Sequence, residues 1–201
     1  MIAAVVLAAG RSTRAGARNK LLASIGGEPM ITRVVRRVIE GGAAPVVVVT
    51  GHEAEKVRAA LAGLTVTFAH NPDYAEGIAT SIRAGIAALP GDVDGALVCL
   101  GDMPALESGD VAGLIAAFDP AAGAAICVPR AGGRQGNPVL FARAFFPEFR
   151  ALAGDRGAKA LIAAHAEAVR EVAVSGDGPL VDLDTEEDIA AFNRRPGDDP
   201  G

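Results

Sequence analysis

The chain has 201 residues, half of them hydrophobic, which is enough for one globular domain with a substantial core. Its net charge of −5 at pH 7 argues against general binding of nucleic acid. No apolar run approaches the roughly 20 residues that cross a membrane, so we expect neither nucleic acid nor a membrane as a partner. An anionic ligand is compatible with this charge, because a few cations in one loop outweigh a weak global field.

Cysteine use and the apolar start of the chain both indicate a cytoplasmic protein. Cys99 and Cys127 lie in apolar runs, so we expect them to be buried free thiols in a reducing compartment. A disulfide framework or a zinc site would need more cysteines at closer spacing. Residues 1–11 (MIAAVVLAAGR) have no basic residue ahead of their apolar run, which predicts a buried strand rather than a signal peptide.

Strand patterns and helix patterns alternate along the chain. Short apolar or β-branched runs predict strands near 2–8, 46–49, 65–69, 95–100, 124–128, 137–141, 170–174 and 180–183. Helical spacing of apolar residues predicts helices near 29–41, 53–62, 78–89, 108–118, 142–151, 157–168 and 185–193. Such alternation favours an α/β layer fold with a mostly parallel sheet. We expect one domain over residues 1–193 and a disordered tail over the polar, Gly/Pro-rich residues 194–201.

The loop after the first strand is a candidate ligand site. In open α/β sheets, ligands bind beyond the carboxyl ends of the strands, where the strand order reverses. Residues 7–20 (LAAGRSTRAGARNK) combine small residues, hydroxyls and four cations at such a place. Gly10 and Gly16 let main-chain N–H groups approach a ligand closely, and with the cations these groups form a polyphosphate cradle. The alternative is a solvated basic loop, and neither the dinucleotide fingerprint nor the P-loop pattern is present.

Two acidic segments are candidates for binding a metal. Asp102 directly follows the predicted strand 95–100, and Mg²⁺ prefers one or two carboxylates plus phosphate oxygens. The alternative is an ordinary turn or helix-cap aspartate. Asp182 and Asp184 fall on one face of the predicted strand 180–183 and its continuation, and either of them could instead cap the helix that follows.

Two further segments carry polar groups beside predicted strands and helices. Gly77 opens a predicted helix that also carries Thr80 and Ser81, and hydroxyls at a helix start either bind a base edge or cap the helix. Residues 132–138 (GGRQGNP) form a polar turn before a strand. By its position, we expect this turn to lie on the side of an acceptor substrate.

Several of these segments together resemble one known family. The stretch LAAGRSTRAGARNKLL resembles the signature L-A-A-G-x-S-x-R-x-G-x-x-K-L of the MobA-like nucleotidyltransferases, especially the molybdenum cofactor cytidylyltransferase branch. The similarity continues through residues 71–86, 100–106, 134–141, 154–162 and 182–189. It implies a Rossmann-like three-layer fold that binds a nucleoside triphosphate, CTP in preference, and Mg²⁺.

The resemblance also implies roles for individual residues. It gives triphosphate contacts and catalysis to Arg14 and Lys20, and metal binding to Asp102 and Asp184. It gives nucleotide contacts to Leu7, Ala8, Ala9, Gly10, Gly77 and Ser81, with the last two on the base side. On the acceptor side it indicates Gly136 and Asn137, although many relatives have His at position 137.

The implied reaction transfers CMP from CTP to the phosphate of molybdopterin or the molybdenum cofactor and releases pyrophosphate, with a molybdoenzyme as a further partner. The acceptor phosphate is already largely ionised at pH 7, because its second pKa is about 6, so no general base is needed. Three alternatives stay open: guanylyl transfer to the same cofactor, sugar-phosphate nucleotidylyl transfer, and a non-catalytic accessory protein that binds the cofactor. Intact Arg14, Lys20 and Asp102 argue against the last of these. Ala9 favours the cytidylyl branch, because the guanylyl branch typically has Gly there.

Overall fold

The computed structural model describes residues 1–11, 19–152, 154 and 157–194. At its centre lies one eight-stranded sheet. Its strands are β1 (Ile2–Ala8), β4 (Val46–Thr50), β5 (Thr67–His70), β6 (Gly95–Leu100), β7 (Ile126–Ala131), β8 (Arg134–Gln135), β9 (Val139–Ala142) and β10 (Val169–Ala173). A separate hairpin joins β2 (Ser24–Ile25) to β3 (Glu28–Pro29).

The order of the strands defines the place where a ligand can bind. Across the sheet the order is β10-β7-β9-β6-β1-β4-β5, with β8 paired to β7. β1 runs parallel to both β4 and β6, whereas β9 runs antiparallel to both β6 and β7. The chain therefore builds the sheet outward from β1 on one side and then returns to its other side with β6. This reversal predicts a crevice at the carboxyl ends of β1 and β6.

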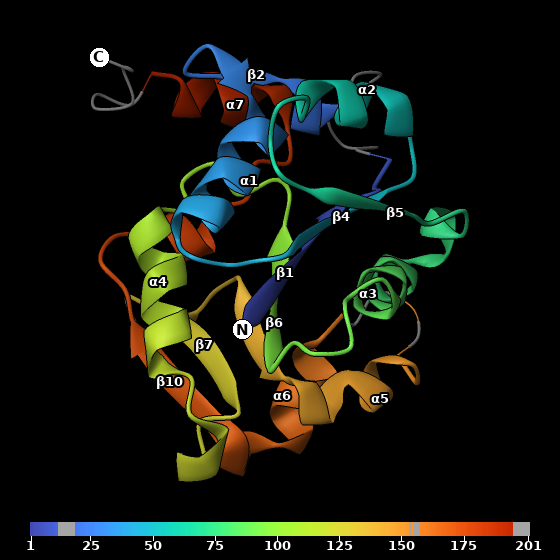
Figure 1. Cartoon of the computed structure of the whole chain (residues 1–201). Helices are drawn as coiled ribbons and strands as arrows, with labels where there is room; N and C mark the ends of the chain where they lie inside the picture. The colour runs from blue at the N-terminus through green and yellow to red at the C-terminus, as the bar shows by residue number, and fades with distance from the viewer. Residues whose placement is uncertain (12–18, 153, 155–156, 195–201) are drawn as a thin grey trace.

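Helices cover both faces of the sheet (Figure 1). One face packs against α1 (Met30–Glu40), α2 (Ala54–Ala60) and α4 (Ser108–Ala117). The other packs against α3 (Ile78–Ala87), α5 (Phe146–Phe149) and α6 (Lys159–Ala164). Alternate residues of β1 serve the two faces, as the pleat of a strand requires: Val6 packs on the α1 side, and Val5 and Leu7 pack on the α3 side. The expected three-layer fold with a mostly parallel sheet is confirmed.

The last helix, α7 (Glu186–Phe192), belongs to a small separate core. There Phe192 and Leu183 pack with Ile25 of β2 and Met30 of α1. The end of the described chain is thereby held beside the segment that follows the first loop. Of the predicted tail, only Arg194 is described, and residues 195–201 lie outside the described part.

The sequence located most elements within a few residues, but it was wrong about three. Residues 180–183 form no strand, because a 3-10 helix ends at Leu180 and the N–H of Leu183 then donates to the carbonyl of Asp102, not to the sheet. The predicted helix 142–151 is interrupted: α5 begins anew at Phe146, which puts Pro147 in a first turn, where the missing N–H costs nothing. The predicted helix 157–168 ends at Ala164, and a separate 3-10 helix follows over 166–168.

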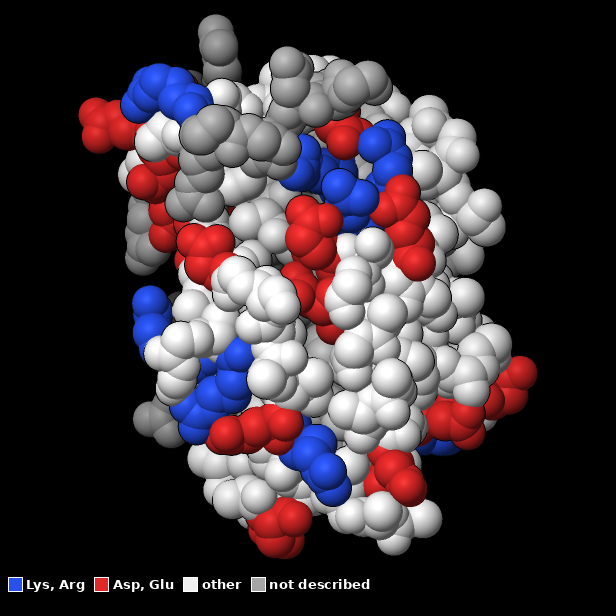
Figure 2. All heavy atoms as spheres, turned by 90° about the vertical axis from the view of Figure 1, so that its left-hand side faces the viewer, with Lys and Arg blue, Asp and Glu red and all other residues white. Residues whose placement is uncertain are grey.

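Burial and surface charge agree with the composition. Cys99 and Cys127 are buried free thiols, and burial raises the pKa of both, that of Cys127 to about 11. On the face shown in Figure 2, basic and acidic side chains alternate and form no broad patch of one sign. Ion pairs such as Arg36–Glu28 at 2.8 Å contribute to this pattern. In the described part of the chain, no helix combines the length and the apolar character needed to cross a bilayer.

Candidate functional site

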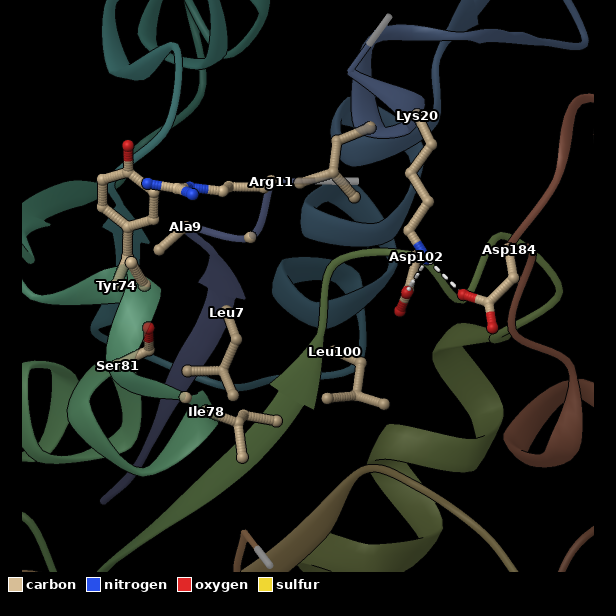
Figure 3. Close-up of a pocket in the computed structure, with 14 residues that line it drawn as sticks. Leu7, Ala9, Arg11, Lys20, Tyr74, Ile78, Ser81, Leu100, Asp102 and Asp184 are labelled. Atoms are coloured by element: carbon tan, nitrogen blue, oxygen red, sulfur yellow. Dashed lines mark hydrogen bonds and ion pairs between the residues drawn. The ribbon is translucent and has the colours of Figure 1, made fainter. Parts of the chain in front are cut away.

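A cavity of about 420 Å³ opens where the strand order reverses, and we call it the switch-point cavity. Its walls come from the end of β1, the start of α3 and the turn after β6 (Figure 3). It brings together predicted site residues from five separate segments of the chain: Leu7, Ala9, Gly10, Lys20, Gly77, Ser81, Asp102 and Asp184. Residues that are distant in sequence therefore meet in one hollow.

One end of this cavity is charged. The Nζ atom of Lys20 lies 2.6 Å from Oδ2 of Asp102 and 2.6 Å from Oδ1 of Asp184. Burial by itself lowers the pKa of Lys20, but the two carboxylates outweigh it, so the pKa lies above its ordinary value. The side chain of Lys20 is only 12% exposed. The Lys20 ammonium therefore lies between the carboxyl groups of Asp102 and Asp184.

Close backbone packing fixes the position of Asp102. The N–H of Gly101 donates to the carbonyl of Leu7 at 3.1 Å. A Cβ at position 101 would lie 2.8 Å from that same oxygen and 2.9 Å from Cδ1 of Ile31. Only glycine lets the turn after β6 lie this close to the end of β1, and the turn carries Asp102 into the cavity.

Asp184 is held beside Asp102 through its neighbour. The N–H of Leu183 donates to the carbonyl of Asp102 at 3.1 Å, and the Leu183 side chain is buried. The expectation that Asp182 and Asp184 share one face is wrong, because Asp182 lines a different cavity. Neither caps α7, since Thr185 is its N-cap and forms a capping box with Asp188.

Helix capping does not account for Asp102 or for Lys20 either. The helix after Asp102, α4, has Glu107 as its N-cap, in a capping box with Asp110. Lys20 opens a short 3-10 helix whose cap is Asn19, and the Asn19 side chain accepts the N–H of Leu21. Asp102 therefore lies in the turn after β6 but caps no helix, and its carboxylate contacts Lys20.

The other end of the cavity is formed by small, hydroxyl and aromatic side chains. Ser81 and Tyr74 line this end, with Ala9 close to the Tyr74 ring (Figure 3). The guanidinium of Arg11 lies over that ring, 5.5 Å from its centroid. Gly77 begins α3 at φ 114°, a backbone conformation that favours glycine. The cavity thus has a charged end with one ammonium and two carboxylates, and a second end, which we call the aromatic end, with small, hydroxyl and aromatic side chains beside one guanidinium.

Three residues near this cavity were not singled out from the sequence: Arg11, Asn71 and Tyr74. Asn71 follows β5 directly and is only 3% exposed, and its side chain donates to both Thr80 and Ser81. The sequence did offer a signal for Asn71, because it is a polar residue just after the predicted strand 65–69. Tyr74 is the only tyrosine of the chain. Thr80, in contrast, does not line the cavity, and neither hydroxyl caps α3.

Some predicted residues do not join the cavity or lie outside the described chain. The Ala8 side chain packs into the core on the α1 face, opposite Leu7, so at most its backbone faces a ligand. Gly10 is not in the left-handed region, and a Cβ there would meet no atom of the described residues within 4 Å, its chain neighbours aside. No described residue therefore requires glycine at this position. Arg14 and Gly16 lie outside the described residues.

A neighbouring cavity of about 670 Å³ contains the predicted acceptor residues. Gly136 and Asn137 line it together with the cations of Arg134 and Lys159. A Cβ at Gly136 would lie 2.3 Å from the carbonyl oxygen of Pro179, and the N–H of Asn137 donates to that carbonyl at 2.8 Å. The two cavities adjoin, because both are lined by Leu7, Ile78 and Leu100.

The donor set suits a hard divalent cation that also binds a ligand. Among the described residues, no group of three or more His, Cys, Asp or Glu side chains could hold a metal alone. The carboxylates of Asp102 and Asp184 converge on one cation, the Lys20 ammonium. Mg²⁺ is typically bound by one or two carboxylates and completes its shell with phosphate oxygens.

Comparison with known proteins identifies the family. The sequence pattern of the MobA-like NTP transferase domain matches residues 4–169. The chain belongs to this family. The bifunctional protein GlmU of Pelobacter propionicus is 36% identical over 143 residues, which are 71% of this chain and 30% of that protein. The chain spans only about a quarter to a third of the length of such curated relatives.

Solved structures of similar length agree with this family. Rv0371c from Mycobacterium tuberculosis is 29% identical, with a TM-score of 0.84 over 96% of this chain and 98% of that chain. A nucleotidyl transferase from Methanothermobacter thermautotroptrophicus is 26% identical, with a TM-score of 0.83 over 96% of both chains. Rv0371c has also been solved in complex with manganese, with a TM-score of 0.78 over 95% of this chain and 97% of that chain.

Proposed function

We propose that this MobA-like NTP transferase moves CMP from CTP to the phosphate of molybdopterin or the molybdenum cofactor and releases pyrophosphate. The observation that carries the proposal is the polarity of the switch-point cavity. Lys20, Asp102 and Asp184 form its charged end, and Ser81 and Tyr74, with the Arg11 guanidinium over the Tyr74 ring, form its aromatic end. This arrangement matches a triphosphate with its metal at one end and a base at the other.

We assign Mg²⁺ to the carboxylates of Asp102 and Asp184. Their oxygens already converge on one ammonium at 2.6 Å, so the same pair suits a divalent cation. When bound, Mg²⁺ supplies charge neutralisation for the triphosphate. The manganese complex of Rv0371c supports a divalent metal in this family.

The residues of the chain then bind and align the two substrates. Lys20 and, by the sequence motif, Arg14 bind the triphosphate. The open space at Gly10 leaves room for a phosphate beside the backbone. The acceptor lies in the neighbouring cavity, where Gly136 and Asn137 form the wall and Arg134 and Lys159 suit an anion.

The reaction needs alignment more than acid or base chemistry. An oxygen of the acceptor phosphate attacks the α-phosphorus of CTP, and the bond from that phosphorus to pyrophosphate breaks. The attacking oxygen is already ionised at neutral pH, so no proton has to be removed. The shared wall of Leu7, Ile78 and Leu100 brings the two substrates together, and their alignment lowers the barrier.

The Lys20 contacts favour catalysis over passive storage of the cofactor. A protein that only stores the cofactor does not need an ammonium between two carboxylates next to an acceptor cavity. The buried thiols of Cys99 and Cys127 suit a reducing compartment, where CTP and Mg²⁺ are both at hand. We propose that a molybdoenzyme receives the product there.

Pyrophosphate release by the purified protein tests the function. CTP, Mg²⁺ and molybdopterin should together give steady release, and omission of the acceptor or addition of a chelator should abolish it. Parallel reactions with GTP, and with a sugar phosphate in place of molybdopterin, separate cytidylyl transfer from guanylyl transfer and from sugar-phosphate nucleotidylyl transfer. Release with a sugar phosphate but not with molybdopterin would contradict the acceptor. Binding of molybdopterin without release from any triphosphate would indicate an accessory protein.

A further inference from the structure

Asn71 lies buried next to the aromatic end of the switch-point cavity and bonds residues at the start of α3. It is 3% exposed and does not itself line the cavity. Its backbone N–H donates to the carbonyl of Thr50, at the end of β4, at 2.8 Å. Its side-chain Nδ2 donates to Oγ1 of Thr80 at 2.9 Å and to Oγ of Ser81 at 3.0 Å. Both hydrogens of the amide group are therefore used on the first turn of α3.

A neighbouring backbone group fixes which way this amide points. The N–H of Asp73 lies 3.0 Å from Oδ1 of Asn71. Because a backbone N–H can only donate, the atom facing it must be the amide oxygen. The NH₂ group consequently faces the two hydroxyls, and both hydroxyl oxygens act as acceptors toward Asn71.

The two hydroxyls differ in what their own hydrogen atoms can do. Thr80 Oγ1 lies 3.0 Å from the carbonyl of Asp73 and 2.9 Å from that of Gly77, so its hydrogen has an acceptor within the protein. The hydrogen bonds of the described residues include none donated by the Ser81 hydroxyl. Ser81 lines the switch-point cavity, between Tyr74 and Ile78 in Figure 3. Its hydrogen is therefore available to a ligand in the cavity.

We propose that Asn71 is a positioning residue that holds the Ser81 hydroxyl as a hydrogen-bond donor toward the nucleobase. The base end of the cavity then selects a ligand edge that carries an acceptor atom. This inference rests on the proposed function. On its Watson–Crick edge cytosine presents two adjacent acceptors, O2 and N3, whereas guanine presents two adjacent donors, N1–H and the N2 amino group, beside the single acceptor O6. A donor facing a donor loses its hydrogen bond, so the arrangement disfavours guanine.

Equilibrium binding of CTP with Mg²⁺, without an acceptor substrate, tests this inference in a double-mutant cycle. Ser81→Ala removes the donor, and Asn71→Asp replaces the NH₂ group with an oxygen of similar size. The Ser81 hydroxyl then turns to donate to the new carboxylate. Each single variant should bind CTP about 3- to 10-fold more weakly and lose a similar factor of its preference over GTP. The double variant should bind no more weakly than the weaker single variant.

Thr80→Val is the matched control. It removes a hydroxyl that shares the same amide partner but does not line the cavity. Its Tm should fall, while CTP affinity should stay within about twofold of the unmodified chain. This separates loss of packing around Asn71 from loss of the donor in the cavity.

The cycle has clear outcomes that would overturn the inference. Losses that multiply in the double variant would mean that Asn71 does not act through Ser81. If Asn71→Asp fails to fold, Ser81→Ala decides alone, and unchanged CTP affinity and selectivity overturn the inference. The unmodified chain is first tested with CTP, UTP, GTP and ATP. Preference for another triphosphate contradicts the cytidylyl function, and the cycle then uses that nucleotide; binding of none overturns both proposals.

Discussion

At the scale of single residues, the proposed chemistry depends most on the contacts of Lys20 with Asp102 and Asp184. Both contacts are 2.6 Å long, and the side chain of Lys20 is 12% exposed, so solvent screens the group only weakly. Because its pKa lies above its ordinary value, Lys20 keeps its charge through neutral pH. That charge is lost only as the pH rises through this raised pKa.

Asp102→Asn should remove most of the turnover while the protein stays folded. The change deletes one negative charge and nearly preserves the shape, so metal binding weakens more than packing. We expect pyrophosphate release to fall by about 100-fold or more at limiting Mg²⁺. Glu187→Gln, which removes an exposed charge on α7 away from the cavity, is the control. Near-normal turnover of Asp102→Asn at limiting Mg²⁺ would show that this residue does not bind the metal.

Lys20→Met should change two affinities in opposite directions. The affinity for CTP with Mg²⁺ should fall about 10- to 100-fold, because a charge-assisted contact with phosphate is lost. The affinity for Mn²⁺ without nucleotide should rise, because the carboxylates of Asp102 and Asp184 lose their competing ammonium. Calorimetry measures the first affinity and electron paramagnetic resonance the second, with the exposed Lys56→Met as a control. Unchanged CTP affinity would remove Lys20 from the binding site.

Ala9→Gly should narrow the preference for CTP over GTP without reversing it. Ala9 lines the aromatic end of the cavity and is almost fully buried. One methyl group in a pocket contributes about 1–3 kcal/mol to discrimination. The CTP-to-GTP rate ratio should therefore fall by about tenfold to a few hundredfold. Initial rates at equal, subsaturating triphosphate measure it. An unchanged CTP-to-GTP ratio would mean that position 9 does not select the base.

At the scale of elements, two glycines near the cavity separate packing from binding. Gly10→Ala places a methyl group where no atom of the described residues lies within 4 Å, its chain neighbours aside, so we expect Tm not to fall. We expect CTP affinity to fall, because the triphosphate is proposed to lie beside Gly10. Gly101→Ala meets the carbonyl of Leu7 at 2.8 Å and should destabilise the fold by about 1–3 kcal/mol. A Gly10→Ala variant with unchanged CTP affinity would place the triphosphate elsewhere.

The elements show how far the sequence could predict the fold. Continuous apolar runs located β1, β4 and β6, because strands buried on both faces need hydrophobic residues throughout. The apolar run at 180–183 gave the same signal, yet its hydrogen bonds go to Asp102 and not to the sheet. The direction of β9 could not be predicted from the sequence either. That β9 runs antiparallel follows from its pairing with β6 and β7, which lie far apart in the chain.

The candidate site was predicted in part for similar reasons. Lys20, Asp102 and Asp184 stand in recognisable motifs, and the structure joins them in one cluster. Asn71 acts through buried hydrogen bonds to a later helix, and no local pattern reports such contacts. The role of Tyr74 could not be predicted without the fold either. Its ring lines the cavity because a 3-10 helix, Tyr74–Glu76, directly precedes α3.

At the scale of the whole molecule, the reversal of strand order explains why the site lies where it does. β1 and β6 end together, α3 starts beside them, and the chain before α7 returns to contact the turn after β6 (Figure 1). The switch-point cavity and its neighbour open at this same edge and share one wall. This edge of the sheet therefore offers two adjoining cavities, as the proposed reaction of two substrates requires.

Transfer of labelled phosphate tests the central claim most directly. The purified chain is incubated with Mg²⁺, molybdopterin and CTP that carries a phosphorus label at either the α- or the γ-position. For cytidylyl transfer we expect the α-label to appear in the acceptor product, in a one-to-one ratio with released pyrophosphate. We expect the γ-label to leave entirely in pyrophosphate. CTP that binds but leaves no α-label on the acceptor, or a γ-label found on the acceptor, would contradict cytidylyl transfer by this protein.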